Sequence, residues 1–539
     1  MLIKPREPNS YIENSAKIGA LISWARDQGV YISEKIHYPC IFQPGYPGTV
    51  ALSDINPEEL LISVPNSLLL STKFSNPPEL TTFFTENPDF FSLPCREHED
   101  YRMLSYLLFE MSKKNSSWQV YFDSLPQTVE TIADWREMEL VELQDSDFVN
   151  DALIRKNYNT QLTKDLSSVF CKYPLLFKPE LVTPTKVLWG WIVMTTRCFG
   201  GSLPFPSLIP VADFLNHSNG PTVYYYAGRG DSAPDSINLS EEDLDEELLD
   251  ESDCVKMSLR KLMKINFMQY EETEETKGFC SELQSLIAQH ELKLQKKKKE
   301  TEKDSPTAES EDMFFQIRTS RTEKYEQGSQ VTISYGNYSN RMLLTNYGFS
   351  TPNNIYDYAR VKFPLKSILK PEQYTKLSEK YDNPLCVAFK FKSNVLNLEF
   401  LSIIRAVLWE TYLPVECFMY PQSMELEGKV LGVVLEMLEG HLDEFETSLE
   451  EDKQKIQRGL GHRMYFAVRN RKVVFRIGVK ECLTGQVELV RMAMKLVKLK
   501  QEGKQIESCE LGEGKGHIDL ESYWEGLEKY ANLLMGKVE

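Results

Sequence analysis

The sequence predicts an α+β protein, with small β-sheets that are interrupted by a helical insertion and followed by an all-α C-terminal domain. Short apolar runs separated by Pro and Gly fill residues 40–70, and a second β pattern appears at residues 314–335. Apolar residues recur at three-four spacing between these stretches and again after about residue 360. We therefore expect two β parts that are distant in sequence, followed by a separate helical domain.

The first predicted element is a short helix over residues 18–25, because its apolar side chains share one helical face and Gly29 follows as a cap. Short strands are predicted for three apolar runs bounded by turn residues, 51–52, 60–65 and 68–70. A helical insertion over about residues 75–200 follows. Its last helix, 186–197, is entered through Thr183-Pro184, a typical helix start.

Residues 228–312 differ in composition from the rest of the chain. They are acidic at first, then Lys-rich at 296–299, then rich in Ser, Thr and Glu, with few aromatic residues. We expect a flexible insert, with one helix at about 280–294. The β pattern resumes at 314–317 and 331–333, and helical spacing at 400–408 and 431–442 predicts helices. The expected domains are residues 1–350 and 360–539.

Composition limits the classes of partner. The chain has 539 residues, a formal net charge of -18 and 10 cysteines. Such acidity argues against direct nucleic-acid binding, since phosphate neutralisation requires clustered Lys and Arg, and it favours a basic protein partner. The scattered cysteines have no zinc-site spacing, so no metal is expected. Residues 1–8 resemble no signal peptide and no run is long enough to cross a membrane, which predicts a cytoplasmic protein, with the nucleus as a second location.

Residues 210–220, Pro-Val-Ala-Asp-Phe-Leu-Asn-His-Ser-Asn-Gly, form the most informative motif. Taken alone, its Asn, Ser and Gly residues favour a turn, and His217 is typical of a packed histidine. Tyr335 and Tyr347 alone are typical of core tyrosines, and Arg197 of a cation at a helix C-terminus. These features gain functional meaning only in combination.

In combination and in this order, they resemble the family of Rubisco large-subunit methyltransferase, which includes ribosomal-protein lysine methyltransferases and the actin-histidine methyltransferase. The resemblance covers most of the chain outside residues 228–312. It is carried by the motifs Ile22-Ser-Trp24, Leu61 to Leu70, Ser117-Trp118, Tyr121, Leu125-Pro126, Trp135, Arg197, Pro210 to Ser218, Tyr335-Gly336 and Tyr347 to Phe349, and more weakly by Val474 to Leu483. It implies a SET domain followed by a helical substrate-binding domain.

The resemblance also implies S-adenosyl-L-methionine as the cofactor and a set of site residues. Tyr335 would be the catalytic tyrosine, beside the transferred methyl group and the incoming amine. The implied cofactor-binding residues are Gly45, Tyr46, Pro47, Arg197, Asp213, Phe214, Leu215, Asn216, His217, Tyr347, Gly348 and Phe349. Pro44 and Pro47 depart from the glycine-rich pattern that the family has near its start.

The implied activity is protein-lysine N-methylation of a non-histone protein, such as a ribosomal protein or a translation factor, by a monomeric enzyme. Lysine is favoured because Phe199 occupies a position where the actin-histidine enzyme has asparagine, and an apolar side chain suits a lysine stem. Two alternatives stay open. The protein could methylate histidine, or it could be a catalytically silent SET-fold module that binds a protein. In a third interpretation, residues 296–299 contact nucleic acid, although a charge-balanced linker fits them better.

Overall fold

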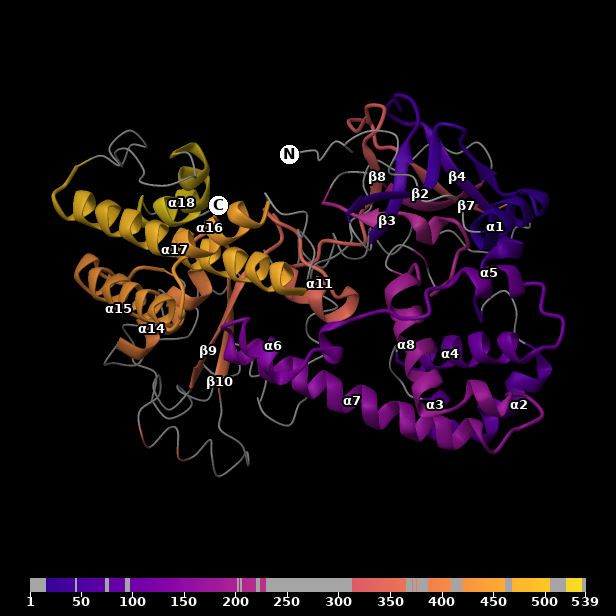
Figure 1. Ribbon diagram of the computed structural model, residues 1–539. Helices are drawn as coiled ribbons and strands as arrows, with labels where there is room; N and C mark the ends of the chain where they lie inside the picture. The colour runs from indigo at the N-terminus through magenta and orange to yellow at the C-terminus, as the bar shows by residue number, and fades with distance from the viewer. Residues whose placement is uncertain are drawn as a thin grey trace. The chain divides into compact units, whose positions relative to one another are not determined.

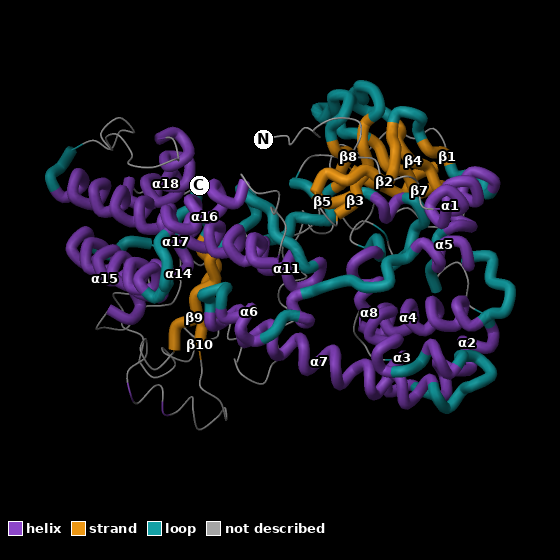
Figure 2. Tube along the Cα trace, viewed as in Figure 1, coloured by secondary structure: helices purple, strands orange, loops and turns teal. Residues whose placement is uncertain are grey.

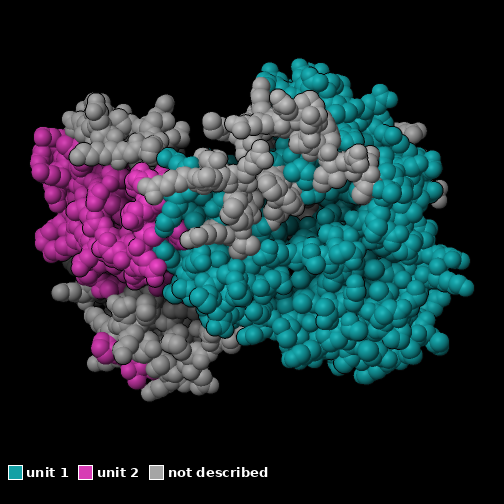
Figure 3. Space-filling view, in the orientation of Figure 1, with its two compact units in different colours: residues 1–247, 308–355, 455–474 teal, residues 248–307, 356–454, 475–539 magenta. Residues whose placement is uncertain are grey.

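The computed structural model describes most of the chain (Figure 1). The described residues are 16–43, 46–72, 77–92, 97–200, 203, 206–219, 223–228, 313–364, 371, 375, 386–408, 418, 420–460, 468–504 and 520–535. The acidic insert and its expected helix at 280–294 lie outside them. The chain divides into two compact units, coloured in Figure 3. Unit 1 comprises residues 1–247, 308–355 and 455–474, and unit 2 comprises 248–307, 356–454 and 475–539.

Unit 1 contains two four-stranded sheets. One has the order β1 (Tyr31–Ile32), β4 (Leu60–Pro65), β7 (Met313–Arg318) and β6 (Val223–Gly228). The other has the order β2 (Ile36–Gln43), β3 (Tyr46–Ala51), β8 (Gln330–Ile333) and β5 (Asn216–His217). Both sheets thus join strands from before and after the insert. In the second sheet β5 runs parallel to β8, with Asn216 opposite Thr332 and His217 opposite Ile333.

The helices of unit 1 begin and end where local signals predict. Helix α1 (Ala16–Asp27) is followed by Gly29, whose φ is 90°, and helix α8 (Pro184–Arg197) begins at Thr183, whose side chain accepts from the Lys186 N–H. The other helices are α2 (Pro78–Glu86), α3 (Pro88–Phe91), α4 (Glu97–Ser112), α5 (Gln119–Ser124), α6 (Glu137–Val141), α7 (Ser146–Phe170) and α11 (Asn340–Tyr347). In Figure 2 the strands of this unit gather in one region, and α2, α3, α4, α7 and α8 form another.

The predicted strand at residues 68–70 is wrong. Residues Asn66–Leu68 form a 3-10 turn instead, closed by a hydrogen bond from the Leu69 N–H to the Asn66 carbonyl. Only Leu70 makes a β-bridge, with Leu208. The apolar run is buried, with Leu70 fully enclosed, but a buried apolar run of three residues does not distinguish a strand from a turn.

Unit 2 is mainly helical, with α14 (Leu398–Leu408), α15 (Met424–Asp443) and α18 (Leu520–Met535). Helices α16 (Leu449–Leu460) and α17 (Val468–Gln501) contribute residues to both units. The prediction of an all-α C-terminal domain is wrong in one respect, because β9 (Ala359–Pro364) and β10 (Cys386–Phe391) pair antiparallel. Ala359 lies opposite Phe391, Val361 lies opposite Phe389, and all four are buried. In β10 the exposed Lys390 stands between the buried Phe389 and Phe391, which is the two-residue period of a strand.

Among the described residues, no helix is both long enough and apolar enough to span a bilayer. The same residues contain no group of three His, Cys, Asp or Glu side chains arranged to hold a metal ion.

Candidate active site

An arginine, an aspartate and a tyrosine meet at the end of α8. Arg197 is its last residue, and its Nη1 donates to the Asp213 carboxylate oxygen Oδ2 at 2.9 Å and to the Asp213 carbonyl at 3.1 Å. The Tyr121 hydroxyl, from α5, donates to the same Oδ2 at 3.1 Å. Burial raises the pKa of Asp213, and the hydrogen bonds from Arg197 and Tyr121 oppose that rise. The other carboxylate oxygen, Oδ1, is buried without a hydrogen-bond partner.

The turn that carries Asp213 is strained. Val211 precedes the 3-10 turn Ala212–Phe214 and has a φ of 71° and a ψ of -41°. A β-branched residue rarely adopts a positive φ, and such strain persists only where the surrounding structure imposes it. Val211 is 4% exposed, so its side chain is held by packing.

The short strand β5 follows this turn and brings Asn216 against β3. The Asn216 side-chain amide donates to the Pro47 carbonyl at 3.0 Å. Gly48 permits the approach, since a Cβ atom there would lie 3.0 Å from Asn216 Nδ2 and 2.4 Å from Gln330 Nε2. Backbone groups of residues 47 and 48 therefore lie directly beside Asn216.

His217 is held in one tautomer. The Tyr335 backbone N–H donates to His217 Nδ1 at 3.0 Å, so Nδ1 carries no proton and Nε2 does. Nε2 lies 3.2 Å from Asn219 Oδ1, to which it therefore donates. Burial lowers the pKa of His217 from its usual 6.5 to about 4, although the bond to Asn219 works against this shift. At neutral pH the imidazole is uncharged, and both ring nitrogens are engaged.

The Tyr335 side chain is half-buried, and its hydroxyl donates to the Leu215 carbonyl at 3.0 Å. Burial raises its pKa to about 12, so the phenol keeps its proton at neutral pH. Neither Tyr335 nor His217 is thus suited to remove a proton from a substrate near pH 7. Such a site suits a reaction that depends on alignment more than on a strong base.

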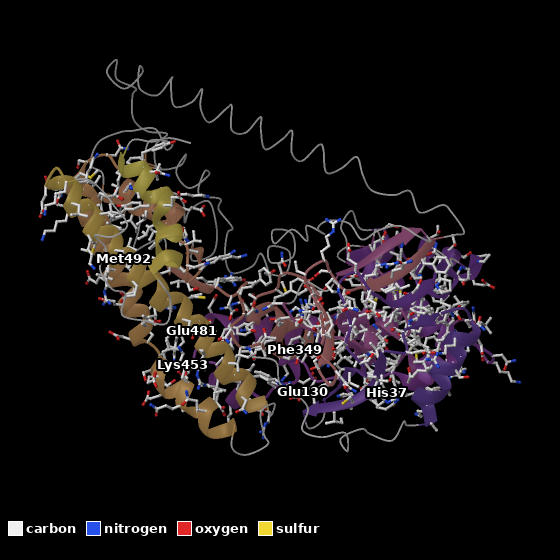
Figure 4. The ribbon with its side chains drawn as sticks, turned by 90° about the horizontal axis from the view of Figure 1, so that it is seen from above. His37, Glu130, Phe349, Lys453, Glu481 and Met492 are labelled. Carbon is white, nitrogen blue, oxygen red and sulfur yellow. The ribbon has the colours of Figure 1, made fainter. Side chains whose placement is uncertain are left out.

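The Tyr335 ring belongs to a cluster of three half-buried aromatic rings. The Tyr335 ring lies 5.0 Å from the Tyr347 ring and 6.4 Å from the Phe349 ring, and Tyr347 and Phe349 are 6.1 Å apart. Gly348 ends α11 with a φ of 75°, and a Cβ there would lie 2.1 Å from the Glu130 carbonyl oxygen. Only glycine fits this close approach, which is why the chain turns here and places Tyr347 and Phe349 around Tyr335. Figure 4 labels Glu130 and Phe349 at this place.

Most of the predicted residues that the structure describes are therefore linked by hydrogen bonds or ring contacts. Arg197 binds Asp213, Leu215 binds Tyr335, Asn216 binds Pro47, and the His217 ring lies 5.2 Å from Tyr335 and 6.0 Å from Phe349. Gly45 lies outside the described residues, and Tyr46 begins β3. The individual roles of all these residues stay predictions.

Sequence reasoning missed two functional candidates. Tyr38 stacks on Phe214, with ring centroids 4.0 Å apart and planes at 9°, and Tyr121 holds the Asp213 carboxylate. Tyr121 belongs to a motif that carries the family resemblance, but that motif assigned it no role. No sequence signal marked Tyr38. Phe199, expected to suit a lysine stem, is buried and its ring meets the Phe315 ring edge-on at 5.0 Å.

No family model matches this chain. It is 28% identical over 201 residues to the fructose-bisphosphate aldolase lysine N-methyltransferase of Arabidopsis thaliana. The aligned region covers 36% of this chain and 38% of that protein. It is 27% identical over 207 residues to the Rubisco large-subunit N-methyltransferase of Pisum sativum, covering 38% and 40%. An actin-histidine N-methyltransferase of Canis lupus familiaris is 24% identical over 210 residues, covering 37% and 34%. The chain thus matches less than half the length of these relatives.

Solved structures resemble the chain over a longer range. Rubisco LSMT bound to sinefungin and monomethyllysine superimposes with a TM-score of 0.56 at 19% identity, covering 92% of this chain and 98% of that one. The SET domain of LSMT bound to methyllysine and AdoHcy gives a TM-score of 0.53 at 17% identity, covering 92% and 97%. Fold and sequence therefore agree, and this chain has the SET-domain fold of Rubisco LSMT and resembles, in sequence, methyltransferases of that type.

Proposed function

We propose that this protein is an S-adenosyl-L-methionine-dependent protein-lysine N-methyltransferase that acts on a non-histone protein. The observation that carries the proposal is the placement of Tyr335. Its protonated hydroxyl is fixed on the Leu215 carbonyl, and its ring lies beside the rings of Tyr347, Phe349 and His217. One relative, whose name specifies lysine N-methylation of fructose-bisphosphate aldolase, supports the same activity.

The residues at the site fit the proposed cofactor. Arg197 supplies a cation for its carboxylate, and the unpartnered Asp213 Oδ1 is an acceptor for a donor-rich ligand. Gly48 lets the β3 backbone approach Asn216 closely. We assign Arg197, Asn216, His217 and the segment Tyr347 to Phe349 to cofactor binding. When bound, the cofactor supplies an electrophilic methyl group on a positively charged sulfur.

The rings of Tyr335, Tyr347 and Phe349 form an aromatic wall, which lowers the main barrier to amine methylation. A lysine amine attacks only when neutral, and at pH 7 its deprotonation costs about 3.4 pKa units, or about 4.6 kcal/mol. The half-buried rings of Tyr335, Tyr347 and Phe349 disfavour the charged ammonium by desolvation. The Tyr335 hydroxyl then orients the neutral amine, and alignment of this kind supplies up to about 7–11 kcal/mol in well-oriented systems.

The net charge of -18 supports a basic protein substrate, and we propose a ribosomal protein or translation factor encountered in the cytoplasm or nucleus. Histidine is the second candidate acceptor, since an actin-histidine N-methyltransferase is among the relatives. Mass spectrometry of proteins from cells lacking this chain separates the two. Loss of a methyl-lysine supports the proposal, and loss of methylhistidine alone contradicts it.

Substitution of Tyr335 by Phe tests the mechanism. Removing one hydroxyl that orients the reacting groups is expected to lower kcat by about 10²–10³-fold. Cofactor binding should persist, and at 100 times its Kd the cofactor should stabilise the variant and the wild type alike by about 2.7 kcal/mol. Tyr31→Phe, at a tyrosine 49% exposed, is the matched control. Full activity of Tyr335→Phe would remove Tyr335 from the mechanism, and a wild-type protein that binds the cofactor but methylates nothing would indicate a binding module.

A further inference from the structure

The turn Tyr335 to Tyr338 is held at both ends by side chains from elsewhere in unit 1. At its start, the Tyr335 N–H donates to His217 Nδ1 at 3.0 Å. At its end, the Tyr338 carbonyl accepts from Asn354 Nδ2 at 2.9 Å. The Tyr338 ring also lies 6.2 Å from the Tyr347 ring, so this turn carries two of the aromatic rings at the site.

The two ends of the turn are connected through side chains. His217 Nε2 donates to Asn219 Oδ1 at 3.2 Å, and Asn219 Nδ2 donates to Asn354 Oδ1 at 3.0 Å. Together with the backbone of the turn, these bonds close a ring that runs from Tyr335 through His217, Asn219 and Asn354 to Tyr338.

Every bond in this ring donates in the same direction. A backbone N–H can only donate, so the Tyr335 N–H fixes the tautomer of His217, which fixes the amide orientation of Asn219 and then that of Asn354. Aligned donors and acceptors of this kind strengthen one another. Asn354 Nδ2 also lies 3.5 Å from Asn340 Oδ1, which accepts more closely from the Thr351 N–H at 2.7 Å. The shorter bond of Asn354 is therefore the one to Tyr338.

We propose that Asn219 and Asn354 are positioning residues that hold Tyr335 in its reactive orientation; this inference rests on the proposed methyltransferase function. Neither amide belongs to the aromatic wall. They act on the backbone that carries Tyr335 and so keep its hydroxyl on the Leu215 carbonyl. A misplacement of 1 Å at a reacting group lowers rates by about 100-fold, so a loosened turn should slow the chemical step.

The test compares Asn219→Ala, Asn354→Ala and the double variant. Each single variant should lower kcat by about tenfold or more, with KM and cofactor Kd changed less than about twofold. The double variant should be no slower than the worse single variant, because a ring that is opened once is already open. Asn219→Asp is the conservative variant. Its carboxylate still accepts from His217 but cannot donate to Asn354, so it should resemble Asn219→Ala.

Hydrogen exchange provides a readout that does not depend on activity. The Tyr335 amide should exchange about tenfold faster in both single variants than in the wild type. Asn150→Ala, at an exposed amide on α7, is the matched control and should change neither rate. Unchanged exchange at Tyr335 and full kcat in both variants would overturn the inference while leaving the methyltransferase proposal standing. A wild-type protein that neither binds the cofactor nor methylates protein would overturn both.

Discussion

An arginine, a carboxylate and a tyrosine meet in the interior of each unit, and the two groups are bonded differently. In unit 2, the closed triad is Arg405, Glu427 and Tyr530. Arg405 donates to both Glu427 oxygens at 2.8 and 2.6 Å and to the Phe418 carbonyl, and Tyr530 donates to Glu427 at 2.8 Å. Both charged side chains are 0% exposed.

In unit 1, the open triad is Arg197, Asp213 and Tyr121. Both donors use the same carboxylate oxygen, the second oxygen has no partner, and the Arg197 side chain is 24% exposed. Buried polar groups normally satisfy their hydrogen-bonding capacity, as the closed triad does. The closed triad, in which both carboxylate oxygens accept hydrogen bonds, thus has a structural role. The open triad leaves one carboxylate oxygen available to a ligand.

The largest expected effect breaks the closed triad. Glu427→Gln removes the charge that balances a buried Arg405 and should lower the free energy of unfolding by about 3–5 kcal/mol. Urea denaturation measures it. The double variant Arg405→Met, Glu427→Leu removes both charges and should recover most of that loss. If the double variant is as unstable as Glu427→Gln, the triad contributes through its shape and not through charge balance.

The next effect concerns pH. Burial lowers the pKa of His217 from 6.5 to about 4, so its contribution to stability is lost as the pH falls through this window. Burial raises the pKa of Glu323 from 4.5 to about 7, so its destabilising effect is relieved over nearly the same fall in pH. In unit 2, hydrogen bonds from Arg476 and Lys480 outweigh burial and lower the pKa of Asp452 from 3.8 to about 2. Its contribution therefore persists until about pH 4.

These opposing shifts make a variant more informative than the wild type. Between pH 6.5 and 4, Glu323→Gln should lose about 2–3 kcal/mol of stability relative to the wild type, because the variant lacks the gain that protonation of Glu323 gives the wild type and no longer offsets the His217 effect. Hydrogen exchange in unit 1, corrected for intrinsic pH dependence, measures the difference. Exchange in unit 2 serves as the internal reference. A wild type and a variant with parallel pH profiles would contradict the assignment to Glu323.

A smaller change in stability is expected from Asp213→Asn in the open triad. Because Arg197 is partly hydrated, the free energy of unfolding should fall by only about 1–2 kcal/mol, less than for Glu427→Gln. Under the proposed function, the loss of the anchored Arg197 should weaken cofactor binding by about tenfold, or 1.4 kcal/mol. Calorimetry measures both quantities. A stability loss that equals that of Glu427→Gln would erase the distinction between the triads.

The smallest expected effect comes from an ion pair at the surface. Arg491 binds Glu439 at 2.6 Å, with side chains 49% and 44% exposed. Arg491→Gln should change the free energy of unfolding by less than about 1 kcal/mol, because water competes for both charges. The same urea experiment provides the measurement. A larger loss would mean that burial is a poor guide to the strength of charge pairs in unit 2.

Sequence reasoning succeeded where a signal is local. Two predictions are confirmed, the start of α8 at Thr183 and the helices α14 and α15 indicated by apolar spacing. Both depend on signals that act over a few residues, namely caps and periodicity. The resemblance also selected residues that do lie together, since the rings of Tyr335, Tyr347 and Phe349 meet. Tyr335, Tyr347 and Phe349 were identified from the order of motifs along the chain. Composition and spacing alone would not have identified them.

Long-range pairing was not predictable in the same way. The parallel pairing of β5 with β8 joins residues more than 100 positions apart, and two residues carry no periodicity. In sequence, Asn219 and Asn354 are ordinary turn residues. Only the folded structure shows that hydrogen bonds link their side-chain amides to His217. The β9 and β10 strands were missed because each is only six residues long and β10 is followed closely by the helical spacing of α14.

The strained Val211 bears on how this protein could be engineered for heat resistance. Replacing it with Gly would relieve about 1–3 kcal/mol of backbone strain. The same change would make the unfolded chain more flexible and would empty a site that is only 4% exposed, and these two losses together are of similar size. Thermostabilising substitutions are therefore better sought at exposed positions away from this turn, such as Leu175, whose side chain is 99% exposed.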